Sequence, residues 1–220
     1  MLYKFLLGLL MVCAALVPAA YLYHVYPLLP ETIPTHFNLS GTADRFGQKQ
    51  NLIFTTALLS AVTLLSFVVI RYLPKIDPKK TAKLSASAFH KMAIAMVIFL
   101  SAINTILIHA TLAGDFNFSK LFNPLLGFFF IYVGNLMYNL KPNYFLGIRV
   151  PWTLENPDNW RATHRMGSIL WVIGGLIILI GGLVLKPAIG EIVFLAVLTV
   201  IVLVPILYSF IYFRKQQQAS

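Results

Sequence analysis

Charged side chains are scarce in this 220-residue chain: they make up 11% of it, whereas hydrophobic residues make up 59%. Soluble domains carry about a quarter charged residues, so the composition excludes an ordinary soluble globular protein. The chain has one cysteine, Cys13, which excludes an internal disulfide framework and a thiolate metal site. Acidic residues are the scarcer charged class, with seven against seventeen Lys and Arg, and the formal net charge is +10. Lipid is therefore the expected main solvent.

Long apolar runs take the place of charge. Six stretches contain no Lys, Arg, Asp or Glu, namely residues 5–30, 50–70, 92–114, 121–140, 166–185 and 192–213. Each has about the ~20 residues that a helix needs to cross a hydrocarbon core. The sequence therefore predicts an all-α polytopic membrane protein with a single membrane domain, residues 1–220. Its six transmembrane helices are expected at about 5–27, 51–72, 92–113, 121–140, 160–185 and 191–213.

The positive charge is unevenly divided between the two sides of such a protein. With six spans, both termini share one side with the loops 73–91 and 141–165. That side carries the whole excess of +10, because basic and acidic residues balance on the other side. The positive-inside rule then predicts cytoplasmic N- and C-termini. This placement explains the charge without a direct nucleic-acid partner.

The expected outer cap, residues 28–50, combines proline with turn-forming residues. Pro34 favours extended geometry in the residue before it, and Gly41 supplies turn chemistry. His36 and Asp44 are two candidate metal ligands, fewer than the three protein ligands that zinc ordinarily takes, so we favour a hydrogen-bonded cap without a metal. No cofactor is predicted. The candidate contact residues of the cap are Pro34, His36, Phe37, Asn38, Gly41 and Asp44.

The 141–165 loop is rich in Pro, Asn, Trp and Arg. Asn156 followed by Pro157 predicts a helix N-cap and first helical position, which would place Trp160 and His164 on one helix face. Two interpretations remain open: a belt of Trp and Arg at lipid headgroups, or a shaped cytoplasmic docking surface. The candidate docking residues are Asn135, Lys141, Pro142, Asn143, Tyr144, Gly147, Arg149, Pro151, Trp152, Thr153, Asn159, Trp160, Thr163, His164 and Arg165.

Small residues recur every seven positions in two of the expected helices. Gly127 and Gly134 lie in the helix at 121–140, and the pairs Gly167-Ser168, Gly174-Gly175 and Gly181-Gly182 lie in the helix at 160–185. A repeated small face lets membrane helices approach closely. These glycines predict that the two helices form a tight antiparallel hairpin.

The helix expected at 92–113 carries a polar sector of Ser101, Asn104, Thr105 and His109. Ionisable groups at membrane depth are expensive and can mark a polar pocket or proton path. We favour the simpler interpretation, a set of hydrogen bonds between helices.

Two sequence patterns resemble the SdpI family of bacterial immunity proteins. The first, L-P-x-x-I-P-x-H-F-N-x-x-G-x-x-D, runs from Leu29 to Asp44. The second, N-x-x-x-x-x-K-P-N-Y-x-x-G-I-R-x-P-W-T-L, runs from Asn135 to Leu154 and is followed by N-W-x-x-T-H-R. The resemblance implies a six-helix protein of the bacterial plasma membrane. It also implies protection against a secreted antimicrobial peptide toxin, and recruitment of a small transcriptional repressor to the membrane.

Two other classes of function compete with immunity. A membrane-surface enzyme acting on lipid or peptide would use His164 as acid or base and arginines such as Arg149 to hold an anionic group. No nucleophile or phosphate-binding glycine loop accompanies them, so we lean against an enzyme. A small transporter would usually need a charged residue deep in a helix, and no Asp, Glu, Lys or Arg lies there.

Overall fold

The computed structural model describes residues 2–38, 41–77, 85–113 and 117–219. Six of its helices are long and apolar enough to cross a membrane, which confirms the predicted six-span helical architecture. They are α1 (Leu2–Val25), α2 (Gln50–Ile76), α3 (Ala86–Ala113), α4 (Ser119–Met137), α6 (Pro157–Val184) and α7 (Pro187–Ala219). The shorter elements are η1 (Tyr26–Leu28), β1 (Thr32–Phe37), β2 (Ala43–Gln48) and α5 (Pro151–Glu155). Lys79, Lys80, Lys83 and Asp115, which entered the charge argument, lie outside the described residues.

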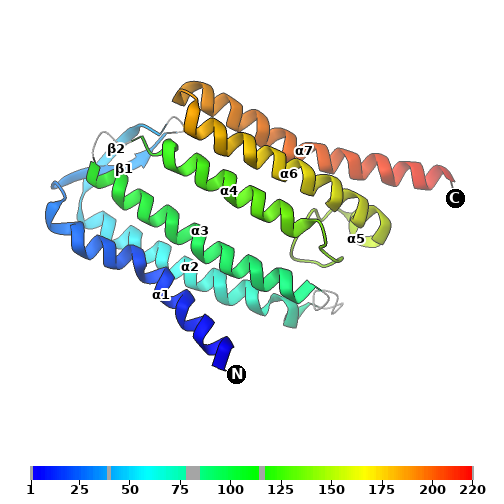
Figure 1. Ribbon diagram of the computed structural model, residues 1–220, viewed down its shortest axis with the longest axis horizontal. Coiled ribbons are helices and arrows are strands. Elements are labelled where there is room, and N and C mark those ends of the chain that lie inside the picture. Colours follow the sequence, from blue (N-terminus) through cyan, green and yellow to red (C-terminus); the bar gives the residue numbers. More distant parts are fainter. Residues whose placement is uncertain (1, 39–40, 78–84, 114–116, 220) are drawn as a thin grey trace.

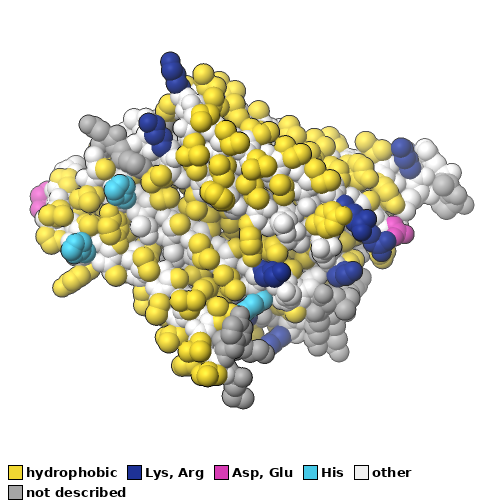
Figure 2. All heavy atoms as spheres, in the orientation of Figure 1, with side chains coloured by type: hydrophobic (Ala, Val, Ile, Leu, Met, Phe, Trp, Pro, Cys, Tyr) yellow, Lys and Arg dark blue, Asp and Glu magenta, His cyan; other side chains and the backbone are white. Residues whose placement is uncertain are grey.

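The helices bury polar residues and expose apolar ones, as expected where lipid is the solvent. In α2, Thr56, Ser60 and Thr63 are buried, whereas Phe54 and Leu65 are exposed. Figure 2 shows apolar side chains covering the long helices. Because lipid tails are as apolar as leucine, an exposed apolar face costs nothing there.

The bundle has two distinct ends (Figure 1). One carries β1 and β2, and we call it the hairpin face. The other carries both chain termini and α5, and we call it the terminal face. Several helices extend past their predicted limits: α2 continues to Ile76, and α7 runs from Pro187 to Ala219. The length of the apolar runs therefore located the membrane-crossing part of each helix, but it did not locate the polar ends of the helices.

Two groups of three helices make up the bundle (Figure 1). In the first, α1, α2 and α3 all pack against one another; in the second, α4 and α7 both pack on α6. The groups touch mainly through α3 and α4, where the rings of Phe99 and Phe129 stack with centroids 4.2 Å apart. The Tyr132 hydroxyl also donates to the Lys91 carbonyl at 3.4 Å. The seam between the halves is thus thinly packed.

Glycines bring α4 and α6 into backbone contact, which confirms the predicted close pairing of these helices. A Cβ added at Gly127 would lie 2.6 Å from the Gly175 carbonyl oxygen, and one at Gly175 would lie 2.7 Å from the Gly127 carbonyl oxygen. Gly174, the other member of the Gly174-Gly175 pair, does not take part in this contact. Its added Cβ would meet Ile201 of α7 at 2.6 Å. Adjacent residues on a helix point about 100° apart, so each glycine pair serves two neighbours.

The segment predicted to form the outer cap contains a β-hairpin. β1 and β2 pair antiparallel, with Thr32 opposite Gln48, and the register is irregular around His36. Gly41 has φ +77°, and its surroundings leave no room for a side chain, since a Cβ would lie 2.5 Å from atoms of Asn117 and Ser119. The Phe118 amide donates to the Gly41 carbonyl at 3.2 Å. The hairpin, which belongs to the first half of the chain, is thereby attached to α4 in the second half.

Candidate functional site

The loop between α4 and α5 is organised by one buried amide, that of Asn143. Its Nδ2 donates to the carbonyls of Lys141 and Leu146 at 3.0 and 3.1 Å. Its Oδ1 accepts from the amides of Phe145 and Leu146 at 2.9 and 2.7 Å. One side chain thus satisfies backbone groups that a loop outside a helix or sheet would otherwise leave unpaired.

His164 closes the other end of this loop. Its Nε2 accepts from the Ile148 amide at 3.0 Å, and its Nδ1 contacts the Trp160 carbonyl at 2.8 Å. An amide can only donate and a carbonyl can only accept, so the imidazole is neutral with its proton on Nδ1. The ring also stacks on Trp160 with centroids 3.9 Å apart. Both nitrogens are engaged and the side chain is buried, which removes His164 as an acid or base at the membrane surface.

Gly147 makes the approach of the loop to His164 possible. Its φ is +103°, a conformation that favours glycine. A Cβ there would collide with the imidazole of His164 and would lie 3.0 Å from Cδ2 of Leu140. The Trp160 indole N–H donates to the Leu140 carbonyl at 2.8 Å, which holds the same wall of the loop.

Polar contacts fasten α5 and α6 to α7. The Trp152 indole N–H donates to Ser209 Oγ at 2.8 Å, and Asn159 Nδ2 donates to the Ser209 carbonyl at 3.0 Å. Asn156 accepts from the Asp158 and Asn159 amides, which confirms the predicted N-cap of α6. Sequence reasoning missed Ser209; its signal was a polar residue isolated in an otherwise apolar run.

The structure divides the predicted docking residues into three groups, buried, half-buried and exposed. Six are buried inside the loop and its supports, so the expectation that they form an exposed surface was wrong: Asn143, Thr153, Asn159, Trp160, Thr163 and His164. Pro142, Tyr144 and Trp152 are half-buried. The exposed members are Asn135, Lys141, Gly147, Arg149, Pro151 and Arg165. The polar residues of the sequence suggested an exposed surface, but most of their polar atoms form hydrogen bonds inside the protein.

Exposed cations remain at the terminal face (Figure 2). Arg149 donates to the Tyr144 carbonyl at 2.5 Å, and the Arg165 guanidinium lies 5.5 Å from the ring centroid of Tyr138. Arg161 pairs with Asp158 at 3.5 Å. The loop also meets the first half of the chain, because the Lys141 amide donates to Ser85 Oγ at 3.0 Å.

At the hairpin face, a cleft of about 590 Å³ lies between the hairpin and the first turns of α4 and α7. Phe37, Phe118 and Phe122 form a stack along it, with successive centroids 5.3 and 5.2 Å apart. His36 and Glu191 also line the cleft. The cleft therefore joins an aromatic wall to polar groups.

The predicted cap residues take different places around this cleft. His36, Asn38 and Asp44 are exposed, Phe37 is half-buried, and Pro34 and Gly41 are buried. Nδ1 of His36 lies 2.5 Å from Oδ1 of Asp44. Among the described residues no third His, Cys, Asp or Glu joins them in a group able to hold a metal ion. Their contact is that of a hydrogen-bonded pair.

Comparisons with known proteins bear on both faces. The model of the SdpI/YfhL protein family matches residues 139–209, which include the terminal-face loop, α5, α6 and most of α7. A second model, a domain of unknown function called DUF1648, matches residues 13–61, which include the hairpin. No solved structure matches the chain significantly.

Two proteins illustrate the similarity. The immunity protein SdpI of Bacillus subtilis is 26% identical over 215 residues, which cover 96% of this chain and 97% of that protein. An uncharacterized protein of Archaeoglobus fulgidus is 39% identical over 57 residues, which cover 23% of this chain and 31% of that protein. Together with the six apolar helices, these matches show a multi-pass plasma-membrane protein that is similar to the SdpI/YfhL family over residues 139–209 and to the immunity protein SdpI over most of its length.

Proposed function

We propose that this chain is an immunity-type membrane protein that protects a cell against a secreted antimicrobial peptide toxin. The observation that carries the proposal is the similarity to the immunity protein SdpI, which covers 96% of the chain and so includes both the hairpin and the terminal-face loop. The excess of positive charge supports an orientation with the terminal face in the cytoplasm and the hairpin face outside.

In this proposal the toxin contacts the hairpin face at the cleft beside the hairpin. The stack of Phe37, Phe118 and Phe122 offers apolar area to a hydrophobic peptide side chain. His36 and Asn38 at the edge offer hydrogen bonds to its backbone. Aromatic walls with a polar rim are typical of peptide-binding surfaces.

The terminal face is the proposed docking site for a small transcriptional repressor. The residues available for contact are the exposed cations Lys141, Arg149 and Arg165 rather than the buried polar residues behind them. An acidic patch on the partner would complement them and increase its rate of association. The buried network of Asn143 and His164 would hold these cations in place.

Expression in a toxin-sensitive bacterium tests the immunity proposal. We expect the wild-type chain to raise the toxin concentration that stops growth, and Phe122→Ala to lower this protection because it removes part of the aromatic wall. Gln48→Ala, an exposed hairpin residue that does not line the cleft, is the matched control. Equal sensitivity with and without the wild-type chain, at confirmed membrane expression, would exclude immunity to that toxin.

A fluorescently tagged repressor tests the docking proposal in the same cells. We expect Arg149→Ala combined with Arg165→Ala to reduce its membrane localisation while toxin resistance stays unchanged. Arg214→Ala, which removes an exposed cation of α7, is the control for loss of charge alone. Unchanged localisation in the double variant would rule out docking through these arginines.

A further inference from the structure

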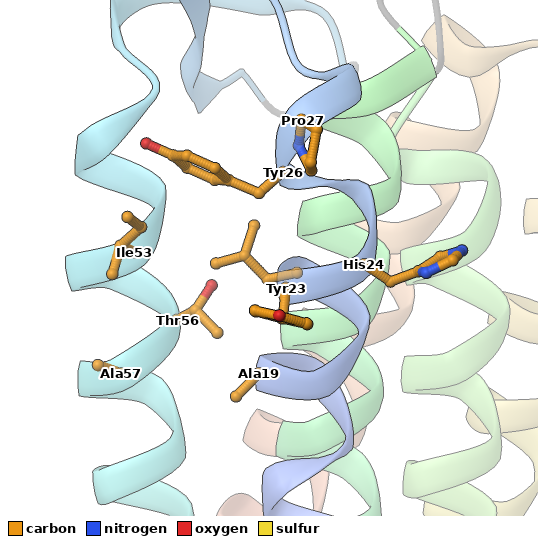
Figure 3. Close-up of a pocket in the computed structure, with 9 residues that line it drawn as sticks. Ala19, Tyr23, His24, Tyr26, Pro27, Ile53, Thr56 and Ala57 are labelled. Carbon is orange, nitrogen blue, oxygen red and sulfur yellow. The ribbon is translucent and has the colours of Figure 1, made fainter.

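A groove between α1 and α2 opens toward the bilayer next to the hairpin face (Figure 3). Its volume is about 620 Å³. Ala19 of α1 and Ala57 of α2 leave it open because their side chains are small, and Figure 3 shows the ring of Tyr26 reaching across its upper end toward α2. Tyr23, 86% exposed, stands beside it. Both walls belong to membrane spans, so the occupant comes from the bilayer.

One buried polar side chain, that of Thr56, lies in the wall of this largely apolar groove. Thr56 is 2% exposed, and among the described residues its hydroxyl has no hydrogen-bond partner. Thr55 and Thr63 in the same helix behave differently, since each donates to the carbonyl four residues earlier, at 2.9 and 2.7 Å. Figure 3 shows the Thr56 oxygen directed away from α2 toward α1. Because an unpaired hydroxyl in an apolar environment costs free energy, an occupant that offers an acceptor is favoured.

The depth of Thr56 indicates what kind of acceptor can reach it. Lys49, at the head of α2, pairs with Glu31 at 2.8 Å in the hairpin region. Thr56 lies seven residues further along the chain, about 10 Å at 1.5 Å per residue. The headgroup layer of a bilayer is roughly 5–7 Å thick on each side of the hydrocarbon core. With Lys49 at the outer edge of that layer, Thr56 lies a few ångströms below its inner edge, next to the glycerol ester carbonyls of a phospholipid.

The headgroup contributes little to this recognition. The Lys49 ammonium lies at the groove's upper end, 5.4 Å from the ring centroid of Tyr26. The hydrogen bond from Lys49 to the Glu31 carboxylate raises the pKa of Lys49 and also compensates its charge. A lipid is therefore recognised here through its chain and its ester rather than through an anionic phosphate.

We propose that the α1–α2 groove binds a diacyl glycerophospholipid, with one acyl chain between Ala19 and Ala57 and the Thr56 hydroxyl donating to an ester carbonyl. Threonine in a helix has two accessible χ1 rotamers, so the hydroxyl can turn to the incoming carbonyl without strain. This site is independent of the proposed immunity function. Its ligand is a lipid of the surrounding bilayer and not the toxin.

Native mass spectrometry of the purified full-length protein tests the proposal with two phosphatidylglycerols of equal chain length, one diester and one diether. The diether lacks the carbonyls. We expect the wild type to retain the diester about threefold more strongly, the factor typical of one hydrogen bond between groups in a membrane. Thr56→Val keeps the shape of the side chain and removes the donor, so it should abolish this preference.

Two further variants separate the groove from general lipid contact. Ala57→Leu fills the groove and should weaken retention of both lipids. The control is Ala95→Leu in the groove of about 280 Å³ between α3 and α4, which should leave the diester preference unchanged. Thermal unfolding checks that each variant is folded.

Three results would overturn the proposal. Equal retention of diester and diether by the wild type would remove the ester hydrogen bond. Full retention by a folded Ala57→Leu variant would remove the groove as the site. A lipid-free wild type that is dimeric, with Ala57→Leu monomeric, would assign the groove to a second copy of the chain.

Discussion

Single residues decide the shape of the terminal-face loop. Gly147 adopts a positive φ directly against the imidazole of His164, and that imidazole carries the Ile148 amide on one nitrogen and the Trp160 carbonyl on the other. Neither position tolerates an arbitrary side chain. Gly147 and His164 are therefore needed for the loop to fold, whether or not the loop binds a partner.

Gly147→Ala should destabilise the protein. A left-handed conformation costs a non-glycine residue about 1–2 kcal/mol, and the collision of the new Cβ with His164 adds to that cost. We expect a lower midpoint of thermal unfolding in detergent. Gly8→Ala is the control, because a Cβ at Gly8 would meet nothing within 4 Å. Equal midpoints for the two variants would contradict the loop geometry.

His164→Phe should also destabilise the protein, but for a different reason. Phenylalanine can keep the stack on Trp160, yet it offers no acceptor to the Ile148 amide, and an unsatisfied buried amide costs about 1–3 kcal/mol. We expect faster hydrogen exchange of this amide together with a lower unfolding midpoint. The exposed His24 of α1, changed to Phe, controls for loss of an imidazole. Unaltered exchange at Ile148 would argue against this hydrogen bond.

At the scale of the element, α6 shows how adjacent glycines are assigned to different neighbours. Gly175 meets backbone atoms of α4, whereas Gly174 meets side chains of Ile201 and Val197 in α7. A methyl group added at Gly175 would have to displace backbone, which moves only with the whole helix. A methyl group added at Gly174 would meet side chains, which can change their rotamers.

Gly175→Ala should therefore be more damaging than Gly174→Ala. We expect overpacking to cost about 1–3 kcal/mol at Gly175, and clearly less at Gly174. Thermal unfolding of the two variants in the same detergent measures the difference, and each serves as the matched control of the other. A larger loss at Gly174 would show that α7, not α4, is the rigid neighbour.

The helices could be predicted from the sequence, while much of the site could not. Apolar length alone identifies a span, since each helix satisfies its own backbone in lipid. Strand pairing in the hairpin includes an irregular register around His36 that no local residue pattern specifies, so Pro34 suggested extended geometry but not the register. A buried residue such as Asn143 resembles a surface residue in a sequence, because its partners are backbone groups that no sequence pattern reveals.

For the whole molecule, the division of charge predicts the orientation. With Cys13→Ala as background, the chain has no other cysteine, so a single new one reports its own side. We expect an impermeant maleimide on intact cells to label Thr42→Cys in the hairpin, but to label Glu155→Cys in α5 only after permeabilisation. Both positions are exposed, which makes them matched probes. The reverse pattern would invert the proposed roles of the two faces.

The thin seam between the two halves has a mechanical consequence. The halves touch near the middle of α3 and α4 through Phe99 and Phe129, and they are joined again at both ends, through Gly41 with Phe118 and through Ser85 with Lys141. A rigid half that turns about its central contact must move its two ends in opposite directions. If one half turned in this way, a displacement of the hairpin would be accompanied by an opposite displacement at the terminal-face loop, without a chain of rearranged side chains between them.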